Sequence, residues 1–219
     1  MRNLLNTGLQ IPNPVSHQQH HHFIDNLPVN ASTGESIPVI DPSNGTIFAS
    51  LARGSTADIE KAVIAARRAS EGVWGRTTAA ERGRILARWA ALVADAVQEL
   101  GSLEARDTGN PLRQGLADAN ALVRYFEYYG GAADKLHGQT IPYQNGYTVM
   151  TIREPHGVTG HIIPWNYPMQ IFGRSVGAAL AVGNACVVKP AEDACLSLLR
   201  VAQLGEQAGL PPGALNIVT

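Results

Sequence analysis

The 219-residue sequence carries 17 Lys and Arg against 18 Asp and Glu, which gives a formal net charge of −1. This balance excludes a strong positive field that would steer the protein to nucleic acid or to an anionic membrane, and no run of Lys and Arg forms a basic arm. The 45% of apolar residues is typical of a globular protein, and the length allows one large domain or two small ones.

The N-terminal stretch predicts little structure. Residues 1–22 are rich in Asn, Gln, His and Pro, and we expect them to be disordered. Met1–Pro14 has one basic residue and a broken apolar stretch, so it is a poor match to a signal peptide. His17 and His20–His22 lack Cys or carboxylate partners that would set ligand geometry. We therefore expect a solvated segment and predict no metal site.

Short strands come next, and helices follow them. Ser55 and Asp58 have the spacing of a capping box ahead of an apolar helical stripe. Thr78 and Glu81 repeat this signal before a second helical region, which Gly109 ends. The three strands predicted before these helices are separated by turn-forming residues and span 23–29, 37–40 and 46–49.

A third helical stretch is predicted over residues 113–133. It contains an aromatic cluster that could either pack between helices or offer a stacking platform for nucleic-acid bases. No basic cluster surrounds these residues, so packing is the better interpretation. The cluster consists of Tyr125, Phe126, Tyr128 and Tyr129.

Residues 139–156 predict a projecting β-hairpin. Two alternating segments, Thr140–Tyr143 and Tyr147–Arg153, flank a turn at Gln144–Gly146. Its Asn-Gly pair is the strongest short hairpin signal. A hairpin in this position is a natural arm for subunit contacts.

From Gly157 the pattern becomes strand, helix, strand, helix, strand. The strands are short and apolar, as in a parallel sheet that is covered on both faces, and the fold class is therefore α/β. The predicted strands span 158–163, 185–188 and 215–218, and the predicted helices span 169–182 and 193–208. The uncharged run 175–188 is too short and too interrupted by Gly to cross a bilayer.

The two cysteines do not form a disulfide framework. Cys186 lies in an apolar strand pattern and Cys195 lies near a helix start. We expect two reduced thiols and a cytoplasmic location.

Polar residues follow the first two of these strands, where open α/β sheets bind ligands. Asn166 precedes Pro168, a residue favoured in the first turn of a helix, so Asn166 is either an N-cap or a carboxamide donor aimed over the crevice. Lys189 and Glu192 are either a surface ion pair at a helix start or a pair that binds ribose hydroxyls. The Gly-rich dinucleotide fingerprint is missing from the first turn.

Taken together, these segments resemble the NAD(P)-dependent aldehyde dehydrogenase superfamily, and the resemblance covers nearly the whole chain after about residue 22. The linked motifs fall in the family's order, and the upstream set comprises Phe23–Asp25, Asp41-Pro42, Asp107–Gly109 and Glu154–Val158. The downstream set comprises Ile162–Pro168, Gly183-Asn184, Val187–Glu192 and Ala208–Val218.

The resemblance implies an N-terminal part of the aldehyde dehydrogenase fold, with a Rossmann-like βαβαβ unit, and oxidation of an aldehyde to a carboxylic acid with NAD(P)+. The implied divisions are a disordered segment (1–22) and an N-terminal helical part of the cofactor-binding domain (23–138). An oligomerisation hairpin (139–156) and a truncated NAD-binding unit (157–219) follow. The family forms dimers and tetramers through this hairpin, so a homodimer or homotetramer is implied.

The resemblance also implies roles for single residues. Asn166 matches the family's donor to the oxyanion, which makes it the one catalytic residue expected here. The residues expected to bind the cofactor are Ile162, Ile163, Pro164, Trp165, Asn166, Lys189, Ala191 and Glu192. Because a carboxylate at Glu192 would repel a 2′-phosphate, NAD is expected in preference to NADP.

The expected substrate residues are Tyr167, Gln170 and Arg174. Some family members carry an arginine in the tunnel for a substrate carboxylate, so Arg174 suggests a carboxyl-bearing semialdehyde. The alternative is an arginine bonded to a neighbouring loop or subunit.

Neither the family's nucleophilic cysteine motif nor its general-base glutamate motif occurs in the sequence. We therefore expect an N-terminal fragment that is inactive by itself. Two alternatives stay open: a non-catalytic fragment that binds a nucleotide or a partner, and a relative that transfers the acyl group to coenzyme A.

Overall fold

A five-stranded sheet forms the centre of the computed structural model, which describes residues 18–219. Its strand order is β3-β2-β10-β9-β8; β8, β9 and β10 are parallel, as predicted, and β2 is antiparallel to β10. The predictions for the signal peptide and for His17 fall on residues outside the described part. The strands are β2 (His22–Ile24), β3 (Leu27–Val29), β8 (Val158–Ile163), β9 (Ala185–Pro190) and β10 (Leu215–Ile217).

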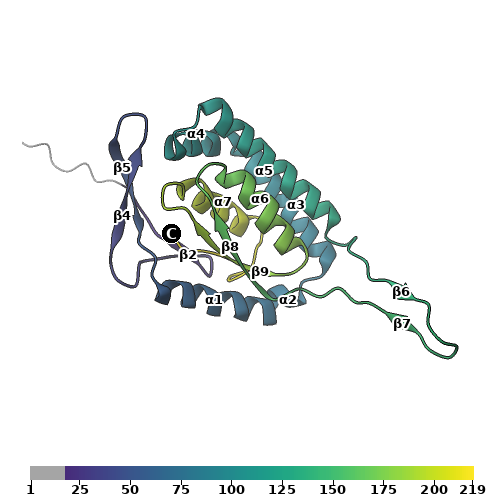
Figure 1. Ribbon diagram of the computed structural model, residues 1–219. Coiled ribbons are helices and arrows are strands. Elements are labelled where there is room, and N and C mark those ends of the chain that lie inside the picture. Colours follow the sequence, from purple (N-terminus) through teal and green to yellow (C-terminus); the bar gives the residue numbers. More distant parts are fainter. Residues whose placement is uncertain (1–17) are drawn as a thin grey trace, which may run out of the picture.

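Helices cover both faces of this sheet (Figure 1). One helix, α1 (Thr56–Glu71), packs across one face, and α6 (Pro168–Ala181) and α7 (Leu196–Gln207) pack on the other. A further layer lies outside α6 and α7 and contains α3 (Ala79–Asp95), α4 (Val97–Thr108) and α5 (Leu112–Ala132). The short α2 (Val73–Arg76) follows α1. Among the residues described, no helix combines the length and the apolar character needed to span a membrane.

Two smaller sheets complete the fold. One has the order β1-β5-β4 and consists of β1 (Gln18–His20), β4 (Ser36–Asp41) and β5 (Thr46–Ala52). The other is the predicted hairpin, with β6 (Thr140–Ile141) paired antiparallel to β7 (Val149–Met150). The hairpin extends away from the body of the molecule (Figure 1). Its ladder is shorter than the alternating sequence predicts, because the hairpin has no neighbouring strand among the described residues.

Two predictions at the N-terminal end were wrong. Residues 18–22, the described part of the predicted disordered segment 1–22, contain β1, which pairs with β5, and His22 is fully buried rather than solvated. The Nδ1 atom of His22 lies 3.0 Å from Thr219 Oγ1. These partners lie far along the sequence, so local composition could not reveal them. The single strand predicted over 23–29 is instead the tight hairpin β2–β3, because Asp25 and Asn26 both have φ of 60°.

The two predicted capping signals are confirmed. Ser55 and Asp58 form a capping box at α1, and the Thr78 hydroxyl accepts a hydrogen bond from Glu81 N at 3.2 Å before α3. Gly109 ends α4 with φ of 77°, a conformation that glycine adopts without strain. Helix α7 begins at Leu196 rather than at Asp193, because the preceding residues form a turn in which Ala194 N donates to Ala191 O.

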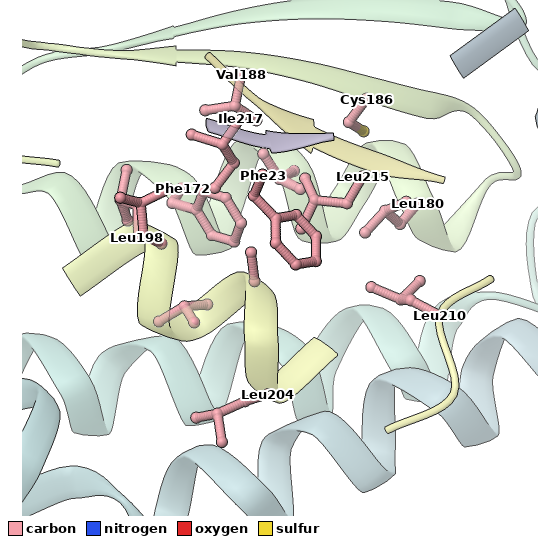
Figure 2. Close-up of a cluster of buried hydrophobic side chains, with 14 of the residues drawn as sticks. Phe23, Phe172, Leu180, Cys186, Val188, Leu198, Leu204, Leu210, Leu215 and Ile217 are labelled. Atoms are coloured by element: carbon pink, nitrogen blue, oxygen red, sulfur yellow. The ribbon is translucent and has the colours of Figure 1, made fainter. Parts of the chain in front are cut away.

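The core lies between the sheet and the helical layers. Figure 2 shows Phe23 from β2 and Ile217 from β10 on the face of the sheet that meets Phe172 of α6 and Leu198 of α7. Deeper in the helical layer, Trp89 of α3 is fully buried. Its ring packs against Phe126 of α5 and Phe172 of α6. Of the predicted aromatic cluster, Phe126 packs in this core whereas Tyr128 stays exposed.

Charged side chains of the outer helices hold both ends of α6 and α7. At the carboxyl ends, Arg82 Nε donates to Ala181 O at 3.0 Å and Arg88 Nε donates to Ala208 O at 2.8 Å. Both guanidiniums come from α3 and satisfy carbonyls that the helices leave free. At the amino ends, Leu196 N donates to Asp107 Oδ2 at 2.9 Å. The outer layer therefore fixes the position of the two helices that follow the strand ends.

Candidate functional site

The carboxyl ends of β8 and β9 lie side by side. Ile163 is in register with Pro190, and Ala191 N donates to Ile163 O at 2.8 Å. The loop after β8 carries Asn166 and the loop after β9 carries Glu192. The structure thus brings together the two polar segments that the sequence places far apart.

Asn166 is not the N-cap of α6. The capping position belongs to Tyr167, with φ of −147° and no side-chain capping hydrogen bond. The exposed Asn166 uses its backbone carbonyl to accept a hydrogen bond from Asn110 Nδ2 at 3.3 Å. Within residues 18–219 its side-chain amide makes no hydrogen bond, so the amide is free to donate to a ligand. The capping alternative is therefore wrong.

Lys189 and Glu192 form an ion pair at the end of β9. Lys189 Nζ lies 3.0 Å from Glu192 Oε2 and also donates to Pro190 O at 2.7 Å. A hydrogen bond from its own backbone, and then Lys189, lower the pKa of Glu192, so this carboxyl stays ionised. Both side chains are exposed, and α7 begins four residues after Glu192. The pair thus presents a donor and an acceptor to solvent.

A cleft of about 270 Å³ adjoins these loops. Trp165 and Glu192 both line it, so the cleft joins the loop after β8 to the loop after β9. Its other lining residues come from β4, from the turn after β4 and from the segments that end α4 and precede α7: Pro38, Val39, Ile40, Pro42, Asp107, Thr108 and Asp193.

The strand end presents fewer side chains than expected. Ile162 is 87% exposed, whereas Ile163 is 1% exposed because successive side chains of a strand point to opposite faces. Pro164 and Trp165 are exposed. Ile163 can therefore offer a ligand only its backbone. Ala191 is half-buried, and its N–H already bonds to Ile163.

The expected substrate residues do not form one surface. Gln170 Nε2 donates to the buried Asp118 Oδ1 at 2.6 Å, so its amide points into the protein. Arg174 lies one turn farther along α6 and is exposed, and Tyr167 is 41% exposed. Asn166 precedes the helix, so the four-residue spacing that places side chains on one helix face applies only to Gln170 and Arg174.

Neither cysteine is fit to be a nucleophile. Burial raises the pKa of the Cys186 thiol to about 12 and raises that of Cys195 further. Both side chains are buried and unpaired by disulfides. The Nδ1 atom of His161 lies 2.6 Å from Ser175 Oγ, and burial lowers the pKa of His161. Across the described residues, no group of three or more His, Cys, Asp or Glu has metal-binding geometry.

Sequence reasoning missed three buried acids beneath the strand-end loops. Burial raises the pKa of Glu104 to about 8 and that of Asp107 to about 7, and Asp118 is also fully buried. A usable signal was present in the sequence, because Glu104 and Asp107 continue the helical stripe of the buried Leu100. Acids on the apolar stripe of a helix are rarely buried without a specific role.

These acids predict how stability depends on pH. Up to about pH 8, folded Glu104 keeps a proton that the unfolded chain has released. Burial lowers the pKa values of His20, His22 and His161, and these groups contribute the opposite slope around pH 6.5, so the prediction is made for the difference between the wild type and Glu104→Gln. Relative to Glu104→Gln, the free energy of unfolding of the wild type should fall by about 1.4 kcal/mol per pH unit as the pH rises from 6.5 to about 8. Urea unfolding of both proteins at a series of pH values measures this difference, and parallel pH profiles would contradict the prediction.

At low pH the stability of the fold depends on a different carboxyl group. Although burial would raise the pKa of Asp58, hydrogen bonds from Ser32 and Ser55 hold it well below its ordinary value. The stability that Asp58 contributes is present above its unfolded pKa and is lost as the pH falls through the folded one.

Comparisons with known proteins agree with this geometry. The chain matches the model of the aldehyde dehydrogenase family over residues 29–219. It is 46% identical over 208 residues to the mitochondrial benzaldehyde dehydrogenase of Antirrhinum majus, covering 94% of this chain and 39% of that protein.

Solved structures agree as well. A presumed aldehyde dehydrogenase from Burkholderia cenocepacia is 68% identical with a TM-score of 0.90, over 91% of this chain and 42% of that one. The NAD+ complex of an aldehyde dehydrogenase from Bacillus cereus is 40% identical with a TM-score of 0.90, over 92% of this chain and 41% of that one. The chain thus spans about two fifths of the length of these relatives. The matches confirm the resemblance read from the motifs, and the chain belongs to the aldehyde dehydrogenase family.

Proposed function

We propose that this chain is the N-terminal portion of an NAD(P)-dependent aldehyde dehydrogenase that oxidises an aldehyde to a carboxylic acid. The observation that carries the proposal is the unengaged amide of Asn166 beside the Lys189–Glu192 pair, at the ends of two adjacent parallel strands. Both cysteines are buried and protonated. The attacking thiolate must therefore come from residues beyond these, and the chain by itself is inactive.

The strand-end residues suit a dinucleotide and an aldehyde. Lys189 can donate to ribose hydroxyls and the ionised Glu192 can accept from them. The same carboxylate would repel a 2′-phosphate, which favours NAD over NADP. When bound, the cofactor accepts the hydride from the substrate. Asn166 donates a hydrogen bond to the oxygen of the aldehyde as that oxygen gains negative charge.

The test uses the complete open reading frame that contains this chain, referred to below as the complete enzyme. We expect the frame to supply an accessible cysteine and a glutamate, and the purified protein to form NADH from aldehydes without coenzyme A. A product that appears only with coenzyme A would indicate an acyl-transferring relative. Absence of NADH formation with a broad aldehyde panel would reject the proposal.

We further propose that Arg174 binds a carboxylate on the substrate, which makes a semialdehyde the substrate class. Arg174→Leu in the complete enzyme should raise KM for a carboxyl-bearing aldehyde by about 10- to 100-fold, because a charge-assisted hydrogen-bonded pair is lost. KM for a neutral aldehyde of similar length should change little. Arg124→Leu, at an exposed arginine of α5, is the control. Equal effects of Arg174→Leu on both aldehydes would reject the assignment.

The hairpin supports the proposal of a homodimer or homotetramer. Several of its large apolar side chains are exposed in this chain. An isolated two-stranded hairpin is only marginally stable, and exposed apolar side chains of this kind are typical of a protein–protein interface. They are Tyr143 (67% exposed), Tyr147 (68%), Met150 (61%) and Ile152 (74%).

Replacing Met150 and Ile152 with serine in the complete enzyme should therefore shift the mass measured by light scattering to a smaller species. Ile64→Ser is the matched control, because Ile64 is 65% exposed but lies on α1, away from the hairpin. An unchanged mass for the hairpin variant would show that the hairpin is not part of the subunit interface.

A further inference from the structure

One buried carboxyl group contacts the first turns of both helices that follow the strand-end loops. Glu104 Oε2 accepts hydrogen bonds from Met169 N at 3.3 Å and from Ser197 Oγ at 2.9 Å. Met169 is the second residue of α6, and Ser197 is the second residue of α7. Glu104 itself is fully buried on α4. A single side chain from the outer layer thus connects the segment after Asn166 with the segment after Glu192.

A second buried acid extends this connection. Asp118 on α5 accepts hydrogen bonds through Oδ1 from Gln114 Nε2 at 2.7 Å and from Gln170 Nε2 at 2.6 Å. Gln170 lies in the first turn of α6, next to Met169. The start of α6 is therefore held from two helices, by its backbone and by a side chain.

The other oxygen of each carboxyl group has no donor. Glu104 Oε1 and Asp118 Oδ2 are both buried and unpartnered, and the two side chains bond to adjacent residues of α6, Met169 and Gln170. Two carboxylates can only accept hydrogen bonds, so neither orphaned oxygen can be satisfied by the other group unless one of them carries a proton. One proton between the groups satisfies both orphaned oxygens and removes the repulsion between two buried charges.

We propose that Glu104 and Asp118 share one proton, and that the pair positions Asn166 relative to Glu192 by fixing the first turns of α6 and α7. Glu104 is on this account a positioning residue. The inference rests on the proposed function for its kinetic consequence, but the shared proton itself does not depend on turnover.

The surroundings of the pair favour the protonated form. Within the described residues no Lys, Arg or His forms an ion pair with Glu104 or Asp118. The nearest further acid on α4, Asp107, also has a buried oxygen without a donor, and it bonds to the backbone of α7 rather than to the pair. Burial first, and then the charge of Asp118, raise the pKa of Glu104 to about 8, although Ser197 opposes the shift.

Infrared difference spectra of the complete enzyme test the shared proton without requiring activity. At pH 7 the wild type should show the carbonyl bands of protonated buried carboxyl groups, from the Glu104–Asp118 pair and in part from Asp107, and Glu104→Gln should lose the component that belongs to the pair. Glu99→Gln changes an exposed acid of the same helix and should keep that component. A spectrum of Glu104→Gln identical to that of the wild type in this region would overturn the shared proton, whatever the kinetics show.

Kinetics test the positioning role. A glutamine at 104 can donate to Asp118 and still accept from Met169 and Ser197, so Glu104→Gln should keep kcat within about threefold at pH 7. Glu104→Ala should lower kcat by about 10- to 100-fold, because small displacements of catalytic groups have effects of this size. The ratio of wild-type to Glu104→Gln activity should also fall as the pH rises through about 8. If Glu104→Gln is as impaired as Glu104→Ala at pH 7, or if Glu104→Ala matches the wild type, the positioning role is wrong.

Discussion

Replacing Asn166 with alanine in the complete enzyme is expected to lower kcat for aldehyde oxidation by about 10²- to 10³-fold, with little change in KM for NAD. The side-chain amide of Asn166 is exposed and makes no hydrogen bond within residues 18–219, while its backbone is held by Asn110 at 3.3 Å. The backbone that carries the donor is therefore held in place, and no internal bond of the side-chain amide must break before the amide meets the substrate oxygen. Donors of this kind act mainly on the transition state, where the negative charge develops.

Two variants make this experiment specific. Asn166→Asp keeps the shape but replaces the donor with a carboxylate, so it should be at least as slow as Asn166→Ala. Asn110→Ala removes only the contact to the Asn166 backbone and should have a much smaller effect on kcat. Steady-state rates of NADH formation measure all three. A value of kcat for Asn166→Ala within threefold of the wild type would show that this amide does not stabilise the transition state.

Replacing Trp89 with alanine is expected to lower the free energy of unfolding by about 3–5 kcal/mol. Trp89 is fully buried, stacks on Phe126 with ring centroids 4.2 Å apart, and meets Phe172 edge-on at 6.1 Å. Its indole Nε1 donates to Val201 O at 3.0 Å, so one side chain joins α3, α5, α6 and α7. Alanine would leave a cavity among four helices and also remove the donor of a buried carbonyl.

Urea unfolding of the complete enzyme, followed by circular dichroism, measures this loss. Trp89→Phe keeps an aromatic ring but loses the hydrogen bond, so its effect should be about 1–3 kcal/mol. Trp165→Ala removes a tryptophan that is 57% exposed and should change stability by less than about 1 kcal/mol. Equal losses for Trp89→Ala and Trp165→Ala would mean that burial in the helical layer is not what stabilises this fold.

Local patterns predicted most of the secondary structure. The capping signals at Ser55 and Thr78, the stop at Gly109 and the Asn-Gly hairpin all act within a few residues, so the sequence shows them directly. The Asp25-Asn26 turn was missed because the apolar residues on both sides read as one strand, although both turn residues tolerate positive φ.

The candidate site was predictable only in part, because some of its contacts join residues that lie far apart in the sequence. The order of motifs identified Asn166, Lys189 and Glu192, and their neighbourhood follows from the parallel pairing of β8 with β9. The buried acids beneath them were missed, because their partners Met169, Ser197 and Leu196 lie 65 to 93 residues away in the sequence. Because successive side chains of a strand point to opposite faces, the sequence could have predicted that Ile163 points into the core.

The pairing of β2 with β10 has a consequence for how the protein is made. The buried contact between His22 and Thr219 spans 197 positions, so the first strand of the central sheet meets its partner only after nearly all of these residues have left the ribosome. At about 5–20 residues per second this delay is roughly 10–40 s. During that time the apolar strand that carries Phe23 can pair only with the short β3 and lacks β10 on its other edge, which makes it a natural binding segment for a chaperone on the nascent chain.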